Sequence, residues 1–170
     1  MKKIILAVIG IVLAAILLIH LIYSFFMPDK IPASIPDEMQ KIVNALDNES
    51  KSDIDFLQKA YDIVNSRYTS PSMGYLKEPQ RLFMKNLDNI WTSQGYLPCD
   101  KQNYVLKVML VKSRWFNETD IKEIFTSCII TPHYYLKIKL NNNSYIAADM
   151  WGADHGYKLG EHTGGYCSDR

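Results

Sequence analysis

Three side chains that can act together in catalysis stand at the edges of predicted helices and strands. Cys99 is placed at the start of an apolar helix, His133 begins a strand, and Asp149 ends the following strand. A thiol nucleophile, an imidazole base and a carboxylate that orients the base form a working arrangement for cysteine acyl transfer. The residue types therefore predict a thiol nucleophile, a base that activates it, and a carboxylate that orients the base.

A predicted hairpin brings the imidazole and the carboxylate together. The sequence NNNS at residues 141–144 predicts its turn, because asparagine tolerates a positive φ. With the turn near residues 141–143, His133 and Asp149 lie nearly opposite one another. Directly opposed side chains have Cβ atoms about 4.5–5.5 Å apart, which allows an imidazole to hydrogen-bond a carboxylate.

The position of the cysteine predicts how its thiol is activated. Between Tyr104 and Val111 the only polar residue is Lys107. A helix that is apolar on nearly all sides is typically buried. A cysteine in front of such a helix meets outward-pointing backbone N–H groups, and the helix dipole together with a nearby imidazolium favours the thiolate. The alternatives are a purely structural Cys99 and an Asp149 that only ends its strand.

Other polar residues supply an alternative base and possible supporting groups. His155 is the alternative base, should His133 not serve. The backbone N–H of Cys99 is the expected oxyanion donor, because helix N-termini bind anions. Gln80 and Gln94 are candidates for a second donor.

With this arrangement, the stretch from about residue 53 to residue 151 resembles the transglutaminase-like superfamily of papain-type cysteine enzymes. The resemblance rests on the order Cys, His, Asp, on their spacing, and on a helix-borne cysteine followed by two adjacent strands. The sequence departs from the family pattern at Leu97, where glycine is frequent, and at Met150, where proline is frequent.

The resemblance implies both a fold and an activity. Cys99 would be the nucleophile, His133 would move the proton, and Asp149 would orient the imidazole. The family contains peptidases, amidases and protein cross-linking enzymes, some of them fused to membrane anchors. A catalytically inactive binding module on the same scaffold, held at the cell surface to recognise a peptide or glycan, is the alternative.

The amino-terminal part of the sequence predicts a membrane anchor. Residues 4–27 carry no formal charge, and about 20 apolar residues span a bilayer as a helix. The run is longer than the apolar region of a signal peptide and lacks a cleavage site. Because Lys2 and Lys3 precede it, we expect a single-pass protein of the cell membrane, with a cytoplasmic N-terminus and an extracytoplasmic domain.

The rest of the chain predicts an α+β domain behind a spacer. Residues 1–27 would be the transmembrane anchor, residues 28–36 a proline-rich linker, and residues 37–170 one domain. Apolar periodicity predicts helices at 36–48, 51–68, from Pro79, and from Cys99; alternating β-branched and aromatic residues predict strands at 121–130, 133–140 and 144–151. Helices followed by antiparallel strands indicate helices packed on an antiparallel sheet.

Composition and spacing also limit the partners. With 19 basic and 18 acidic residues, the net charge of +1 gives no indication of nucleic-acid binding. We expect a protein or peptide substrate, by location one of the cell envelope, and neither a cofactor nor a metal.

A zinc site near His155 and His162 is conceivable, but the two lack a common ligand spacing. If Cys99 stays free, Cys128 and Cys167 are the pair available for a disulfide.

Overall fold

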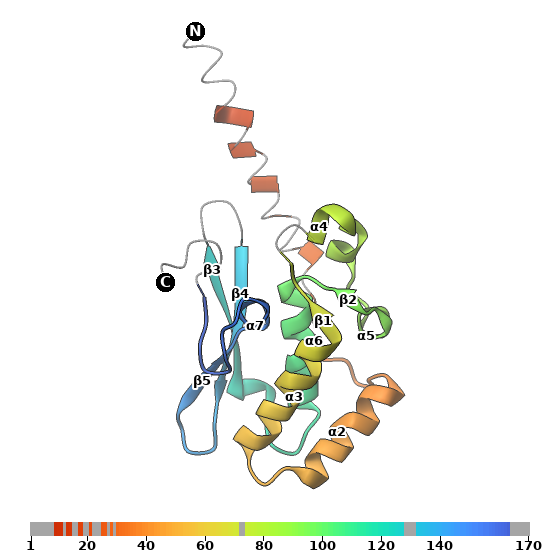
Figure 1. Cartoon of the computed structure of the whole chain (residues 1–170), viewed down its shortest axis with the longest axis vertical. Helices are drawn as coiled ribbons and strands as arrows, with labels where there is room; N and C mark the ends of the chain where they lie inside the picture. The colour runs from red at the N-terminus through yellow and green to blue at the C-terminus, as the bar shows by residue number, and fades with distance from the viewer. Residues whose placement is uncertain are drawn as a thin grey trace.

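The computed structural model describes residues 9–11, 13, 14, 17, 18, 21, 25, 26, 28, 30–71, 74–127 and 132–163. Within these residues the chain is α+β, as predicted, with most helices preceding the main sheet (Figure 1). The helices are α2 (Asp37–Glu49), α3 (Asp53–Arg67), α4 (Gly74–Lys77), η1 (Pro79–Phe83), α5 (Leu87–Thr92), α6 (Cys99–Val111), η2 (Glu118–Asp120) and α7 (Met150–Asp154). The strands are β1 (Tyr68–Thr69), β2 (Gly95–Tyr96), β3 (Ile121–Ser127), β4 (Pro132–Lys139) and β5 (Tyr145–Ala148).

The strands form two sheets of different size. The larger is antiparallel in the order β3-β4-β5, and the smaller is a parallel pair of β1 with β2. The turn between β4 and β5 falls where the asparagines predicted it, and Asn143 has a φ of 64°. The predicted hairpin is therefore confirmed, and its left-handed position is occupied by asparagine, which tolerates that conformation.

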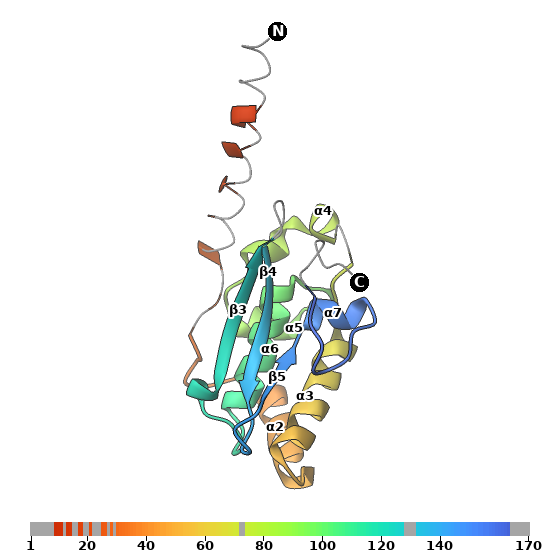
Figure 2. The same cartoon turned by 90° about the vertical axis from the view of Figure 1, so that its left-hand side faces the viewer.

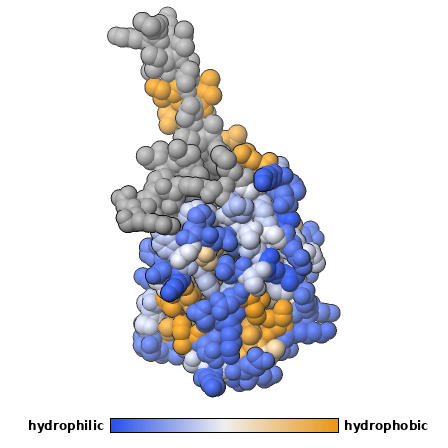
Figure 3. Space-filling model, in the orientation of Figure 1, coloured by the Kyte–Doolittle hydropathy of each residue, from blue (hydrophilic) through white to orange (hydrophobic). Residues whose placement is uncertain are grey.

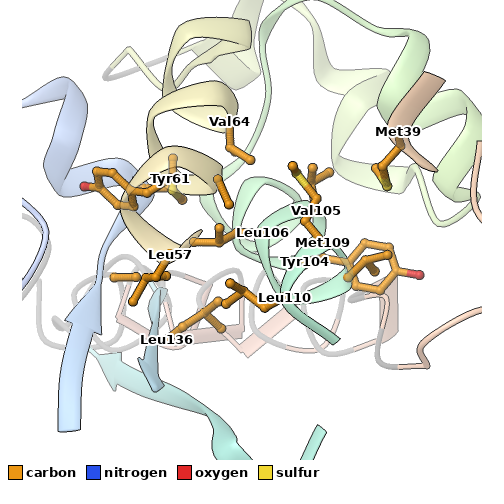
Figure 4. Packing of buried hydrophobic residues seen from close by; sticks show 14 of the residues in the cluster. Met39, Leu57, Tyr61, Val64, Tyr104, Val105, Leu106, Met109, Leu110 and Leu136 are labelled. Atoms are coloured by element: carbon orange, nitrogen blue, oxygen red, sulfur yellow. The ribbon is translucent and has the colours of Figure 1, made fainter. Parts of the chain in front are cut away.

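Helix α6 lies at the centre of the molecule, between α3 on one side and the sheet on the other (Figure 2). Every residue from 100 to 110 is buried, so the prediction of a buried helix is confirmed. Leu106 of α6 packs with Leu57 of α3 and Leu136 of β4 in one apolar cluster (Figure 4). The sheet and α3 are thus joined through the helix that begins at Cys99.

Helix α3 begins and packs nearly as its sequence indicates. The Ser52 hydroxyl accepts a hydrogen bond from the Asp55 N–H at 3.2 Å and caps the helix. Leu57, Tyr61 and Val64 are buried, as expected, but Ile54 is exposed. By contrast, the helix predicted from Pro79 is interrupted: it is split into η1 and α5, and the Asn86 side chain starts the second piece.

Residues 30–36 lie against the domain and contact α6. The hydroxyl of Tyr104 donates to the Lys30 carbonyl at 3.0 Å, and the Lys112 ammonium donates to the Ala33 carbonyl at 3.0 Å. Ile31 also packs against the apolar core. The described residues of this segment belong to no helix or strand, and they contact α6 through these hydrogen bonds.

The predicted membrane anchor is corrected by the structure. In the described part of the chain, no helix has the length and apolar character to cross a membrane. A helix needs about 20 residues in succession to span a bilayer, and none of the described helices combines such a length with apolar character. The single-pass, extracytoplasmic placement that depended on residues 1–27 is therefore wrong.

The prediction depended on apolar composition, and hydropathy alone does not establish a helix that spans a bilayer. The apolar side chains described in this segment, among them Ile9 and Phe25, are exposed, and they form the orange part of the upper extension in Figure 3. The surface of the domain itself is mostly hydrophilic on the face shown.

Removing the side chain that joins the sheet to α6 should destabilise the whole fold. Leu136 is 1% exposed, so we expect Leu136→Ala to lower the free energy of unfolding by about 2–5 kcal/mol. The neighbouring exposed Lys137 provides the control: Lys137→Ala should change it by less than about 0.5 kcal/mol. Urea unfolding measures both, and equal effects would mean that α6 and β4 do not share this core.

Candidate active site

The predicted hydrogen bond between His133 and Asp149 is present. The Nε2 atom of His133 lies 2.9 Å from Oδ2 of Asp149, and both side chains are buried. Leu136 pairs with Ala148 across β4 and β5, so continuing the register sets Asp149 opposite Tyr135. His133 therefore reaches the carboxylate diagonally along the same face, a separation of about 7–8 Å between Cα atoms that an imidazole can bridge.

The Asp149 carboxylate is held on every side. It is 0% exposed, and Oδ1 accepts from the Gly152 N–H at 2.9 Å while Oδ2 also accepts from the Thr163 N–H at 2.9 Å. The first of these bonds makes Asp149 the N-cap of α7. The Tyr61 hydroxyl of α3 donates to the Asp149 backbone carbonyl at 3.1 Å. A carboxylate fixed in this way holds Nε2 and leaves Nδ1 as the ring nitrogen that does not bind Asp149.

Aromatic rings enclose the His133 imidazole. The Trp151 ring meets it edge-on, with centroids 5.5 Å apart, and Tyr135 lies 6.5 Å away on the same strand. Tyr135 in turn stacks on His162 at 4.4 Å. His155, the alternative base, stacks on the Trp151 ring at 3.8 Å and donates from Nδ1 to the Trp151 carbonyl, because a carbonyl can only accept.

Cys99 is the first residue of α6, directly after Pro98, as the sequence indicated. The N-terminal turn of α6 packs against β4, where the Asn103 amide donates to the Tyr134 carbonyl at 2.6 Å. The backbone N–H of Tyr134, the residue after His133, points to the Cys99 sulfur. The structure thus brings the thiol to the strand that carries the imidazole. Among the described residues, however, no hydrogen bond joins the thiol to the His133 ring.

The electrostatics of the thiol differ from the expected activation. Burial, and next the negative charge of Asp100, raise the pKa of Cys99 to about 12, although the backbone N–H groups of Tyr134 and Asp100 act in the opposite direction. The carboxylate of Asp149 raises the pKa further. The thiol is therefore neutral at rest, because desolvation and two carboxylates outweigh the helix dipole that the sequence suggested.

The first turn of α6 contains polar residues whose burial the sequence did not reveal. The Lys101 ammonium is 1% exposed and binds Oδ2 of Asp100 at 2.5 Å and the Phe26 carbonyl at 2.7 Å. The Gln102 amide donates to Ser70 Oγ at 2.7 Å. A run of charged and amide residues at a helix start normally predicts a solvated turn. This turn is buried only because the rest of the chain packs around α6.

Several sequence-based candidates fall outside the site. Gln80 and Gln94 are exposed, and neither hydrogen-bonds near Cys99, so they do not supply an oxyanion donor in this structure. Among the described residues, no group of three or more His, Cys, Asp or Glu side chains could hold a metal ion. Cys128 and Cys167 lie outside the described residues, and so does the disulfide considered between them.

Comparisons with protein-family models, with curated proteins and with solved structures give no match for this chain. The geometry of its own residues is therefore what bears on its chemistry.

Adding a side chain at Gly152 should disturb the buried Asp149 carboxylate. A Cβ at Gly152 would lie 3.0 Å from Cγ and from Oδ2 of Asp149, so Gly152→Ala should lower the free energy of unfolding by about 1–3 kcal/mol. Gly10→Ala is the matched control, because no atom lies within 4 Å of its added Cβ. Thermal and urea unfolding compare the two, and equal stability would show that the carboxylate can move freely.

The raised pKa of Cys99 predicts how its alkylation depends on pH. Only the thiolate reacts with iodoacetamide, so the rate in the folded chain should rise about tenfold per pH unit from about pH 7 to pH 10, without a plateau. Peptide mapping by mass spectrometry measures Cys99 separately from the other cysteines. The urea-unfolded chain is the control, with levelling above about pH 9. A plateau near neutral pH in the folded chain would reveal a thiolate–imidazolium pair.

Proposed function

We propose that the chain is a cysteine acyl-transfer enzyme of the transglutaminase-like kind, a peptidase, amidase or protein cross-linking enzyme, acting through Cys99, His133 and Asp149. The observation that carries the proposal is the buried 2.9 Å contact between His133 Nε2 and Asp149 Oδ2. A carboxylate in that position selects the tautomer and orientation of the ring, which is the task of the third member of a catalytic triad.

In the proposed reaction, His133 acts as a general base on a neutral thiol. Nδ1 takes the proton as the sulfur attacks the carbonyl carbon, and the imidazolium is stabilised by Asp149. The ring then protonates the leaving amine, the C–N bond breaks, and a thioester remains on Cys99. Water or another amine resolves the thioester. This order suits a thiol whose pKa is raised to about 12, because no thiolate has to persist at rest.

The backbone at the start of α6 offers a donor for the oxyanion. The first N–H groups of a helix have no partner within the helix, and the Cys99 N–H belongs to this set. A substrate is needed to complete the contact between Cys99 and His133, since catalytic hydrogen bonds often form only in the substrate complex.

A catalytically inactive module that binds a peptide or glycan is the second candidate. The observation that favours it is the half-buried Cys99 thiol, which has a raised pKa and no hydrogen bond to the imidazole among the described residues. In that case His133 and Asp149 would serve only to hold the end of β5 and α7 in place.

Acetylation by p-nitrophenyl acetate separates the two functions. We expect release of nitrophenolate and an acetyl thioester on Cys99, identified by peptide mapping, and loss of both in Cys99→Ser. His133→Ala should slow acetylation of Cys99 by about 10²–10⁴-fold, the usual contribution of a general base, and Asp149→Asn should slow it less.

Melting temperature is the folding control for each variant, and His162→Ala is the matched histidine control because His162 is an exposed residue. Unchanged acetylation in a folded His133→Ala variant would leave the binding module as the function. Loss of acetylation in His155→Ala, with His133→Ala unaffected, would assign the base to the other histidine.

A further inference from the structure

Strand β5 is shorter than β4, and this leaves the start of β4 without a strand neighbour on that side. The last residue pair of the two strands is Leu136 with Ala148. Just after β4, the Leu140 N–H donates to the Ser144 carbonyl at 2.9 Å, so every second residue back along β4 directs its N–H and C=O to the β5 side. Both backbone groups of Tyr134 therefore point beyond the end of β5 and need partners from elsewhere.

The first turn of α6 supplies those partners. The Asn103 amide donates to the Tyr134 carbonyl at 2.6 Å, and the Tyr134 N–H points to the Cys99 sulfur. Cys99 and Asn103 are four residues apart, so they lie one turn apart on the same face of the helix. Helix α6 thus takes the place of β5 beside the start of β4, and it does so through the proposed nucleophile and Asn103.

The hydrogen bond from Asn103 is the stronger of these two attachments. A thiol sulfur is a weak acceptor, so the Tyr134 N–H alone would leave the first turn of α6 free to rotate or to slide along β4. The amide donor fixes a second point, one turn away from the sulfur. Because His133 directly precedes Tyr134, fixing this turn also fixes the thiol relative to the residue that carries the imidazole.

Asparagine is an unfavourable residue for stability at this position. Asn103 is 3% exposed, and its Oδ1 has no hydrogen-bond partner within the described part of the chain. A buried acceptor without a partner is destabilising, and asparagine is a weaker helix former than leucine. Packing alone would favour an apolar side chain here, as at Leu106 and Leu110. What the amide contributes is its hydrogen bond to β4.

We infer that Asn103 is a positioning residue, which aligns Cys99 with His133 by holding the start of α6 on β4. The inference rests on the proposed acyl-transfer function. Asn103 touches no reacting atom in this role and acts only through the placement of the thiol. A misplacement of about 1 Å can slow a reaction by about a hundredfold. Loss of the amide should therefore slow the reaction only to the extent that the reaction uses His133.

A double-mutant cycle of Cys99 acetylation by p-nitrophenyl acetate tests this role. Asn103→Leu fills nearly the same volume without a donor, and should slow acetylation by about 10–100-fold. In a His133→Ala background the same substitution should slow it by less than about twofold, because residues that act as one unit are non-additive. Gln102→Leu is the matched control. It removes a buried amide of the same turn that donates to Ser70 Oγ and not to β4, and it should leave the effect of His133→Ala unchanged.

Hydrogen exchange at the Tyr134 amide tests the contact without any activity. In the parent chain this amide should exchange slowly, although no strand lies on its β5 side. Asn103→Leu should speed the exchange about tenfold or more, because the first turn of α6 would lose its stronger attachment. The exposed turn residue Asn142 gives the fast reference, and melting temperature is the folding control.

The two measurements separate the failure of this role from the failure of the function. Slow exchange that Asn103→Leu speeds, in a chain that p-nitrophenyl acetate does not acetylate, would support the alignment and overturn the acyl-transfer function. Acetylation that Asn103→Leu slows equally with and without His133 would overturn the role of Asn103 and leave the function standing. Exchange at Tyr134 as fast as at Asn142 in an acetylated parent chain would have the same meaning.

Discussion

The complete burial of the Asp149 carboxylate is the constraint that organises the carboxyl-terminal half of the fold. A charge without solvent is tolerated only when hydrogen bonds replace its water. Those bonds come from the His133 ring on β4, from the Gly152 N–H in α7 and from the Thr163 N–H beyond it. The Tyr61 hydroxyl ties the same residue's carbonyl to α3. One side chain therefore fixes the relative positions of the strands, of α7 and of the chain that follows it.

The sequence allowed the hairpin and the histidine–carboxylate contact to be predicted because both depend on local rules. Asparagine marks the left-handed position at Asn143, and strand alternation sets which residues share a face. The exact register could not be obtained this way: the turn is placed so that Asp149 lies diagonal to His133 and not opposite. Moving the centre of the turn by one residue shifts the cross-strand partner of His133 by two positions. Both registers keep the same side chains on the same face, so side-chain alternation alone cannot distinguish them.

The state of the thiol was not predictable, because it depends on what surrounds the first turn of α6. Proximity to a helix N-terminus lowers a thiol pKa by a local effect, whereas desolvation and the charge of Asp100 raise the pKa of Cys99 through packing. The burial of Lys101 and Gln102 likewise follows from the tertiary fold. The α+β class followed from periodicity, but apolar character at residues 4–27 did not establish a membrane-crossing helix.

The three hydrogen bonds from α6 to the preceding segment determine where a folding unit can begin. Lys101, Tyr104 and Lys112 donate to the carbonyls of residues 26, 30 and 33, so the segment follows the helix in the same direction along its length. A fragment that starts at the first residue of α2 would keep the buried Lys101 ammonium but remove its carbonyl acceptor. The Lys101 ammonium would then keep only the Asp100 carboxylate as its partner, so a fragment without residues 26–33 should be less stable at the start of α6.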